Sequence, residues 1–267
     1  MTQRPQESRM ISGLYSAATG MDAAANRHEV AAENLANIQA PGFRRRVMTQ
    51  TTFEAELRNR MVQNRQGQSI YVGRDLLHSP YSAMLGTTVD DIQYDFAPGN
   101  YQMTNRPLDI AIHGDGFFTV QGPQGPLYTR SGAFHVNENG ELITVDRLPV
   151  IGTNGPIILP ADASTEGVRV LRDGRLMANG VEFGQLQIAR FDQPQQLTAV
   201  GASLFAAPPN MPPEPSEAEI QGGSLELANT SAIGELTAII QGTRQYEAAQ
   251  KALTTIGDAV QRRIGLR

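Results

Sequence analysis

The sequence predicts an α+β fold in which long N- and C-terminal α-helices pair as a coiled coil and the central region is an antiparallel all-β domain. Each end of the chain carries apolar residues at intervals of seven without an interrupting proline. The middle instead holds short β-branched runs separated by Asn-Gly and Asp-Gly dipeptides, which are turn sequences. Helix-forming ends around a β-rich middle predict a subunit that polymerises through its termini.

Breaks in these patterns divide the 267 residues into six expected segments. The segments are an extension with no fold of its own before Met10 (1–9), the N-terminal helix (10–40), an arm or linker (41–86), the central β-domain (87–207), a proline-rich connector and return segment (208–227), and the C-terminal helix (228–267).

The N-terminal helix is expected to run from about Ile11 and to end near Gln39, because Pro41 disfavours helix in the residue before it. One narrow face of this helix is apolar or small. Ala18, Ala25 and Ala32 widen that face with side chains small enough for a partner helix to approach closely. The expected interface residues are Leu14, Ala17, Met21, Ala24, Ala31, Leu35 and Ile38.

The C-terminal helix is expected over about Ser231 to Ile264, with Asn229, Thr230 and Ser231 as an N-cap cluster. A single amphipathic stripe usually packs on its own domain. Here the two stripes lie at opposite ends of the chain and are narrow, which favours pairing with each other and with neighbouring copies. The expected interface residues of this helix are Ile239, Tyr246, Ala249, Leu253, Ile256 and Val260.

The middle of the chain reads as strands and turns. Leu108, Ile110 and Ile112 alternate with less apolar residues, as in a half-buried strand, and Asp115-Gly116 turns the chain into residues 117–120. Tight turns needing positive φ are expected at Asn139-Gly140, Asn154-Gly155, Asp173-Gly174 and Asn179-Gly180. The proline-rich residues 208–215 are expected to stay out of any sheet. Residues 51–64 fit either a short helix or an extended arm.

Composition excludes several classes of protein. The net charge of −5 argues against binding nucleic acid or anionic lipid, both of which require a basic surface. The basic run Arg44, Arg45 and Arg46 is expected to be a solvated segment or a local interface contact. The absence of cysteine excludes disulfides and thiolate chemistry. Residues 1–9 are polar and lead to no apolar core of a cleaved signal, and no stretch is long enough to span a membrane.

No constellation of residues predicts an enzyme, a metal site or a cofactor site. His28-Glu29 begins like a zincin helix, but residue 32 is alanine where the second histidine would stand. His113 and His135 fall in expected strands, where a lone histidine is more often structural than a ligand. Gly114-Asp115-Gly116 lacks the third glycine and the helix of a dinucleotide site.

Three blocks of the sequence, in the same order, resemble flagellar basal-body rod and hook proteins. They are residues 12–21 with 34–44, then 105–118 with 128–134, and finally 223–229 with 235–251. The residues that carry the match are Asn34, Asn37, Gly42, Phe43, Pro107, Leu108, Asp109, Gly114, Gly116, Phe117, Phe118, Tyr128, Arg130, Phe134, Leu225, Asn229, Glu235, Arg244 and Glu247. Arg147 departs from the family at a position where a turn glycine is common.

The resemblance implies a non-enzymatic structural subunit without cofactor or metal. It implies a protein that polymerises with helical symmetry into the rod of the bacterial flagellar basal body, spanning the periplasm and transmitting torque from motor to hook. Implied partners are copies of itself, other rod and hook proteins, the surrounding rings and the flagellar export apparatus, which takes chains without a cleaved signal. Length favours a rod subunit over a hook protein, and the short middle and modest size suit either the proximal or the distal rod, of which the proximal form is the expectation. The alternative is a sugar-binding or enzymatic surface protein with a β-domain, oligomerised by its terminal helices.

Overall fold

The computed structural model describes residues 4–52 and 87–264. The chain forms two compact units, each built from separate stretches of sequence. The helical unit comprises residues 1–33, 46–93 and 232–267, and the globular unit comprises residues 34–45 and 94–231. The chain therefore passes between the units four times, and each unit is described separately below.

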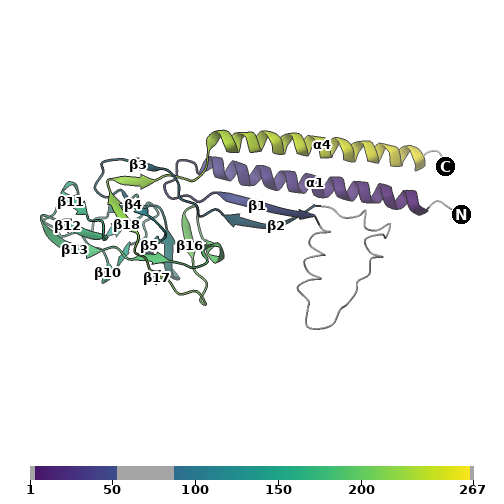
Figure 1. Cartoon of the computed structure of the whole chain (residues 1–267). Helices are drawn as coiled ribbons and strands as arrows, with labels where there is room; N and C mark the ends of the chain where they lie inside the picture. Colours follow the sequence, from purple (N-terminus) through teal and green to yellow (C-terminus); the bar gives the residue numbers. More distant parts are fainter. Residues whose placement is uncertain (1–3, 53–86, 265–267) are drawn as a thin grey trace. The chain divides into compact units, whose positions relative to one another are not determined.

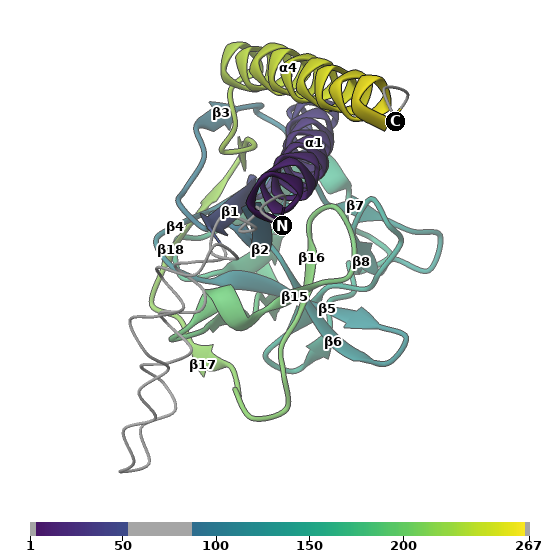
Figure 2. The ribbon, with the colours of Figure 1, turned by 90° about the vertical axis from the view of Figure 1, so that its right-hand side faces the viewer.

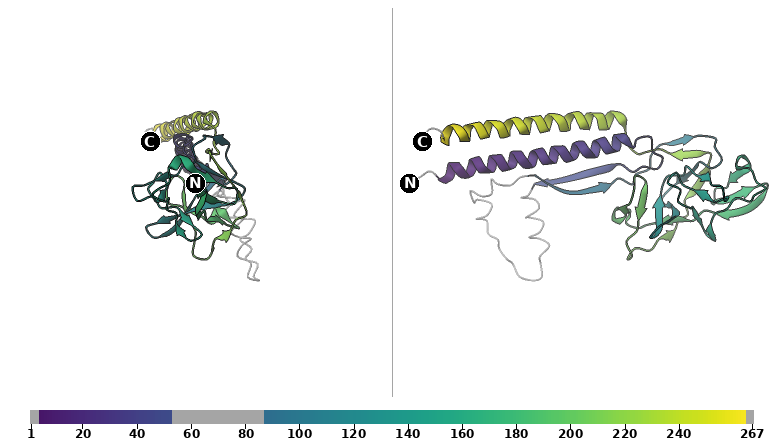
Figure 3. Two further views of the ribbon diagram at one scale, coloured as in Figure 1. Left: turned by 90° about the vertical axis from the view of Figure 1, so that its left-hand side faces the viewer. Right: turned by 180° about the vertical axis from the view of Figure 1, so that it is seen from behind.

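The helical unit contains α1 (Arg4–Ala36), α4 (Ala232–Ile264) and a two-stranded sheet of β1 (Arg46–Thr52) and β2 (Thr87–Tyr94). Figures 1 and 3 show α1 beside α4, with the start of α1 at the same end as the finish of α4, so the helices are antiparallel. The end-on view in Figure 2 shows α1 between α4 and the β1–β2 pair. In the described part of the chain, neither helix is apolar enough over a sufficient length to cross a bilayer.

Both terminal helices form where the heptad pattern predicts them, but their limits differ from those expected. Helix α1 ends at Ala36, before the expected Gln39, so Ile38 lies in the turn that follows the helix. Helix α4 begins at Ala232, next to the expected Ser231. Helix α1 begins at Arg4, so residues 4–9 continue the helix where the sequence predicted an extension without structure. Pro5 is compatible with this start because the first turn of a helix needs no backbone N–H donors.

The globular unit is rich in β-strands, with two short 3-10 helices, η2 (Thr165–Gly167) and η3 (Pro194–Gln196), and every strand pair whose register is known is antiparallel. Its largest sheet has six strands in the order β15-β16-β6-β5-β14-β17. The strands of that sheet are β5 (Phe117–Gly122), β6 (Gly125–Thr129), β14 (Ile188–Arg190), β15 (Thr198–Ala199), β16 (Leu204–Ala206) and β17 (Glu214–Pro215).

Smaller sheets complete the unit. One has three strands in the order β11-β12-β13, and the others are the pairs β18-β4, β19-β3, β7-β8 and β10-β9. Their bounds are β3 (Tyr101–Met103), β4 (Ile110–His113), β7 (His135–Val136), β8 (Leu142–Ile143), β9 (Ile151–Gly152), β10 (Gly155–Pro156), β11 (Val168–Val170), β12 (Arg175–Ala178), β13 (Val181–Gln185), β18 (Glu219–Gly222) and β19 (Ser224–Glu226).

Two consecutive phenylalanines on β5 fill two different cores. Side chains alternate between the faces of a strand. Phe118 accordingly joins the main aliphatic core, where it packs edge-on against Phe134 at a ring-centroid distance of 5.0 Å. Phe117 joins a second, aromatic core that includes Phe205 and Phe191. The sheet around β5 is therefore covered on both faces, which explains why residues 117–120 are all apolar or β-branched.

The expected turns are confirmed by the backbone. Gly140, Gly155, Gly174 and Gly180 all have positive φ. Arg147, which stands where related sequences commonly have a turn glycine, adopts φ 61°. A side chain in this left-handed region costs roughly 1 to 2 kcal/mol, so the turn keeps its shape despite the substitution.

The limits expected for the β-domain need correction. Strand β2 belongs to the helical unit, and the supposed connector 208–227 belongs to the globular unit. Pro215 pairs with Ala189 at the edge of the six-stranded sheet, although this segment was expected not to pair. An edge strand tolerates proline because its outer side needs no ladder donor. Of the expected arm 41–86, and of the short helix or arm at 51–64, residues 53–86 lie outside the described part.

We expect residues 208–231 to be required for folding of the globular unit. Strand β4 has Ile110, Ala111 and Ile112 at most 1% exposed, and it pairs with β18, which lies within this stretch. A chain that ends at Ala207 should lose its cooperative unfolding transition in denaturant, followed by near-UV circular dichroism. The matched chain that ends at Ser231 should keep it. Equal transition midpoints for the two chains would contradict this role.

Candidate assembly interface

The heptad face of α4 is its least exposed face. Along the described part of α4, the side chains of Ile239, Ala249, Leu253, Ile256 and Val260 are half-buried, and the fully buried residues are Glu235 and Gly242. Tyr246 lies on the same face but keeps 39% of its surface exposed. The structure therefore brings the predicted C-terminal interface residues onto one side of the helix.

This face of α4 lies against α1 in a consistent antiparallel register. A Cβ placed on Gly242 would lie 3.6 Å from the Cβ of His28 and 3.6 Å from the carbonyl oxygen of Ala24. Farther along, a Cβ on Gly13 would lie 3.3 Å from Cδ1 of Ile256. Arg27 also donates a hydrogen bond to Gln245 Oε1 at 2.6 Å. These contacts define what we call the seam, and its glycines let the backbones approach closely.

Helix α1 buries a second side that the sequence analysis missed. Ala24 and Ala31 are buried, and the other positions expected in the interface, Leu14, Ala17, Met21, Leu35 and Ile38, are half-buried. Ala23 and Val30 are also buried, at 2% and 7% exposure. Each lies one residue before a seam position and so faces about 100° away from it. Ala25, expected to widen the seam, is exposed.

A short apolar stripe on α4 faces away from the seam. Ile233, Leu236 and Ile240 are 79%, 48% and 53% exposed. Their spacing of three and four residues places them on one side of the first turns of the helix. We call these three residues the outer patch. The sequence signal for it existed, but the seven-residue repeat beside it was longer and masked it.

A buried ion pair joins distant parts of the chain in the globular unit. Nη1 of Arg44 lies 2.7 Å from Oε1 of Glu226, and both residues are 1% exposed. The same oxygen accepts a hydrogen bond from the backbone N–H of Gly99 at 2.9 Å. Arg130 approaches the other carboxylate oxygen at 3.4 Å and donates to the carbonyl of Ile112 at 3.0 Å. Segments from three regions of the sequence thus converge on one carboxylate.

Asn229 ties the same regions together a few residues farther on. Its Oδ1 accepts a hydrogen bond from the N–H of Arg45 at 2.7 Å. Its Nδ2 donates to the carbonyl oxygens of Asp95 and Ala97 at 2.8 and 2.9 Å. Backbone hydrogen bonds from Gly42 to Glu226 and from Asp95 to Arg45, both 2.8 Å, complete the set. We call residues 42–45, 95–100 and 226–229 the clamp.

Two guanidinium groups, of Arg44 in the clamp and of Arg130 outside it, lie beside the Glu226 carboxylate. Burial lowers the pKa of Arg130, and the neighbouring Glu226 carboxylate opposes that shift. Burial raises the pKa of the Tyr101 phenol, and Glu226 raises it further. Glu226 is therefore the counter-charge on which both buried arginines depend. Removing it would leave two cations in a poorly solvated interior.

Two sequence-based interpretations are corrected here. Arg44 was expected to be a solvated residue or an interface contact, but it is buried because Glu226 neutralises it inside the unit. Asn229 was expected to help cap the C-terminal helix, but its side chain bonds residues 45, 95 and 97 instead. One side-chain amide can accept a hydrogen bond from an N–H group and donate two to carbonyl oxygens, so Asn229 can join three segments of the chain.

The other residues of the family motif have mainly structural positions. Leu108, Asp109, Phe117, Phe118, Tyr128 and Phe134 are buried in the globular unit. Phe43 is 1% exposed inside the same unit, so its own subunit already accounts for its burial. Asn34 and Glu235 are buried, Gly42, Gly114 and Gly116 have positive φ, and Arg244 and Glu247 are exposed on α4.

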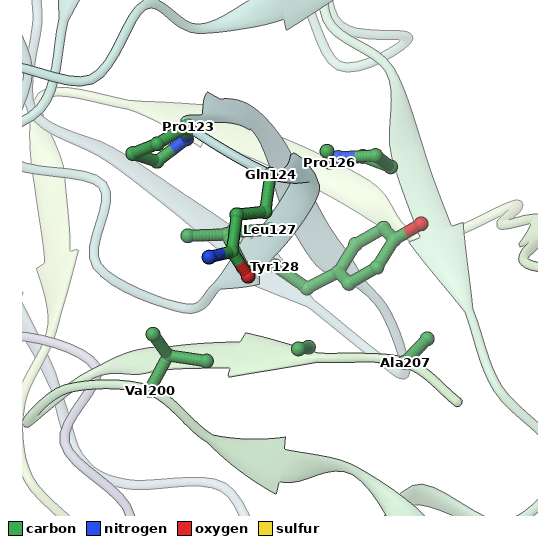
Figure 4. Close-up of a pocket in the computed structure, with 9 residues that line it drawn as sticks. Pro123, Gln124, Pro126, Leu127, Tyr128, Val200 and Ala207 are labelled. Carbon is green, nitrogen blue, oxygen red and sulfur yellow. The ribbon is translucent and has the colours of Figure 1, made fainter. Parts of the chain in front are cut away.

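A pocket of about 440 Å³ lies between the β5–β6 hairpin and the segments around β15 and β16 (Figure 4). Its lining carries no charged side chain and consists of Pro123, Gln124, Gly125, Pro126, Leu127, Tyr128, Val200, Ala206 and Ala207. Among the described residues, no group of three or more His, Asp and Glu side chains is placed to hold a metal ion. The pocket therefore offers no acid, base or nucleophile pair.

Three family models match the chain. A model of flagella basal body rod proteins matches residues 14–44, the D1 domain of the flagellar hook protein FlgE/F/G matches residues 111–178, and the C-terminal domain of basal body rod FlgEFG proteins matches residues 221–264. The first match covers Arg44, and the last covers Glu226 and Asn229. Both ends of the clamp therefore lie in matched regions.

Curated relatives match over almost the whole chain. Flagellar basal-body rod protein FlgG of Agrobacterium fabrum is 35% identical over 91% of this chain and 94% of its own length. FlgG of Buchnera aphidicola subsp. Baizongia pistaciae is 32% identical over 95% of this chain and 98% of its own length. Flagellar basal-body rod protein FlgF of Caulobacter vibrioides is 32% identical over 60% of this chain and 65% of its own length.

Glu226→Gln should destabilise the globular unit by about 3 to 5 kcal/mol, because the substitution leaves buried arginines without their counter-charge. The free energy of unfolding from urea titrations checks this value. Glu214→Gln is the matched control, since Glu214 forms an exposed ion pair with Arg190 at 2.7 Å and should matter little. A loss for Glu226→Gln no larger than that of the control would show that the buried pair is not stabilising.

Proposed function

This chain belongs to the flagellar basal-body rod protein family, and we propose that it is a structural subunit that polymerises with helical symmetry into the axial rod that transmits torque from motor to hook. The observation that carries the proposal is the pair of long terminal helices whose facing surfaces are small and half-buried. The full-length match to rod proteins supports it independently. The protein is a structural component and not an enzyme.

We propose that the seam packs as a coiled coil. The facing residues of α4 recur at intervals of three and four, which is the spacing of knobs that insert into holes of a partner helix. Gly13 and Ala24 are small residues of α1 at contacts with α4, and small residues bury little apolar area. A pair held by so little area is marginal alone. Free subunits should therefore have partly disordered ends that become ordered on assembly.

In the polymer, neighbouring copies would bury apolar surface of α4 that is exposed in the free subunit. The outer patch exposes three large aliphatic side chains on a subunit that belongs to a polymer-forming family. A contact between this patch and a different surface of the next copy is heterologous, and such contacts generate helical filaments when they do not close into a ring. The exposed residues Arg244 and Glu247 border the same side of α4 and can add polar contacts.

Membership of the rod protein family also indicates where the protein is located and what it assembles with. It is a component of the flagellar basal body and assembles with other axial proteins of the rod and hook. We propose further that the rod passes through the periplasm inside surrounding ring proteins. We also propose that the chain leaves the cytoplasm through the flagellar export apparatus without cleavage of a signal.

The position along the rod can be proposed more narrowly. The sequence alone suited either rod position, and the proximal one was expected. The relatives matched over nearly their full length are FlgG, the distal rod protein, whereas the FlgF match covers 60% of this chain. These matches favour the distal alternative. Electron microscopy of basal bodies from a deletion strain decides it, because loss of a distal subunit leaves a short proximal stub.

The rival function, a β-domain that binds sugars or acts on them at the cell surface, has less support. It requires a concave polar site in the globular unit, and the pocket of Figure 4 has no charged lining residue and only two polar side chains, those of Gln124 and Tyr128. Thermal stabilisation of the purified protein by a sugar panel would favour this rival.

Leu253→Asp should abolish incorporation into basal bodies. The substitution places a charge in the seam, at a cost of several kcal/mol if the charge stays unpaired. The globular unit should still unfold cooperatively, because Leu253 lies outside it. Thr255→Asp is the control, since this exposed residue lies off the seam. Complementation of motility and the subunit content of purified basal bodies measure the effect. A Leu253→Asp subunit that incorporates normally would rule out the seam.

Ile240→Asp should block incorporation for a different reason. Ile240 is exposed in the subunit, so the stability of the purified protein should change little. In the polymer the same charge would be buried against the next copy. The neighbouring exposed residue gives a control, Gln241→Asp, which should support motility. If Ile240→Asp cells assemble rods as well as the control cells, the outer patch is not a subunit contact.

A further inference from the structure

We propose that the clamp sets the register of α1 against α4, acting as the short connection that this antiparallel helix pair lacks in sequence. The inference rests on the helix pairing in the proposed function. It assigns a positioning role to Glu226 and Asn229, neither of which lies in the seam.

Antiparallel helix pairs are normally joined by a loop of a few residues, which fixes their register. Here α1 ends at Ala36 and α4 begins at Ala232. The entropy lost on closing a loop grows with its length, so a connection of roughly 200 residues would hold the two helices together weakly. The seam itself adds little discrimination, because its small residues would also fit after a shift of one heptad.

The clamp shortens this connection. Residues 37–41 separate α1 from the clamp, and Thr230 and Ser231 separate the clamp from α4. Inside the clamp, the N–H of Arg45 bonds Asn229 Oδ1 and the N–H of Gly42 bonds the carbonyl of Glu226. The path from one helix to the other through either bond is twelve residues, 37–42 with 226–231 or 37–45 with 229–231, which is somewhat longer than a usual helix–helix connection and far shorter than the sequence between the helices.

The clamp is also built to be rigid at this point. Gly42 has φ 69°, and a Cβ there would lie 2.2 Å from the backbone nitrogen of Ser131. A Cβ on Gly99 would lie 2.0 Å from the carbonyl oxygen of Leu227. Close backbone contacts on both sides of a buried ion pair leave little freedom for the segments that lead to the helices. The clamp thus holds the two exits from the globular unit at fixed separation.

Disulfide trapping in the full-length chain tests this proposal, because the chain has no cysteine of its own that could form another disulfide. In the pair His28→Cys and Gly242→Cys, the Cβ atoms would lie 3.6 Å apart, within the range of a disulfide. The off-register control pair is His28→Cys and Ala249→Cys, one heptad away. Oxidised glutathione takes up the two electrons, and mixed single-cysteine chains report any bond between molecules.

We expect the in-register pair to form its disulfide at least tenfold faster than the off-register pair. Adding Asn229→Ala should slow in-register trapping severalfold, because it removes the side-chain hydrogen bonds to residues 45, 95 and 97 while the bond from Gly42 to Glu226 remains. Asn210→Ala, at an exposed asparagine of the proline-rich segment, should leave the rate unchanged. Hydrogen exchange of β5 shows whether the globular unit stays folded.

The trapping rate and the protection of β5 are read together. Unchanged trapping in Asn229→Ala, with β5 still protected, overturns the proposal. If Asn229→Ala loses that protection, the milder Asn229→Ser replaces it and the same criterion applies. Loss of protection in both variants also overturns the proposal, because Asn229 would then be needed for the fold and not for register. Normal trapping in a chain that fails to enter basal bodies would refute the proposed function and leave this inference standing.

Discussion

Arg44 and Glu226 stand 182 positions apart in the chain, and their ion pair is buried at the point where both termini leave the globular unit. A buried charge is tolerated only when its partner is present. The pair therefore makes the two ends of the sequence depend on each other. The hydrogen bonds of Asn229 extend this dependence to residues 95–97. The strand pairings of β3 with β19 and of β4 with β18 belong to the same closure.

The helical unit is held together by contacts of a different kind. Along the seam, Gly13 and Gly242 allow close approach of the helices, and Arg27 and Gln245 add one hydrogen bond between side chains. Such a seam gives many weak contacts of similar shape and little discrimination between registers. Strong polar contacts are concentrated in the globular unit and weak apolar contacts in the helices. This division suits a subunit whose helices must not aggregate before they meet the growing polymer.

Much of this architecture could be predicted from sequence because periodic patterns record it. The heptads of α4 and the Asn-Gly turns gave the helix limits and the positive φ glycines, since each depends on neighbouring residues. The clamp left no such signal. Arg44 resembled a solvated basic run and Asn229 a helix cap, because burial and pairing across the whole chain are not visible locally. The proline-rich segment was misread for a related reason: whether a strand is an edge strand depends on the rest of the sheet.

The order of elements along the chain determines when the clamp can form during folding. Strand β4 lies in the first half of the chain, whereas its partner β18 and the counter-charge of Arg44 lie near residues 219–226. Contacts so distant in sequence form late, because the entropy of closing a long loop must be overcome before they can stabilise anything. The globular unit therefore closes only when nearly all of the chain is available. Once it has closed, only short segments separate both helices from it, and their pairing becomes a local event.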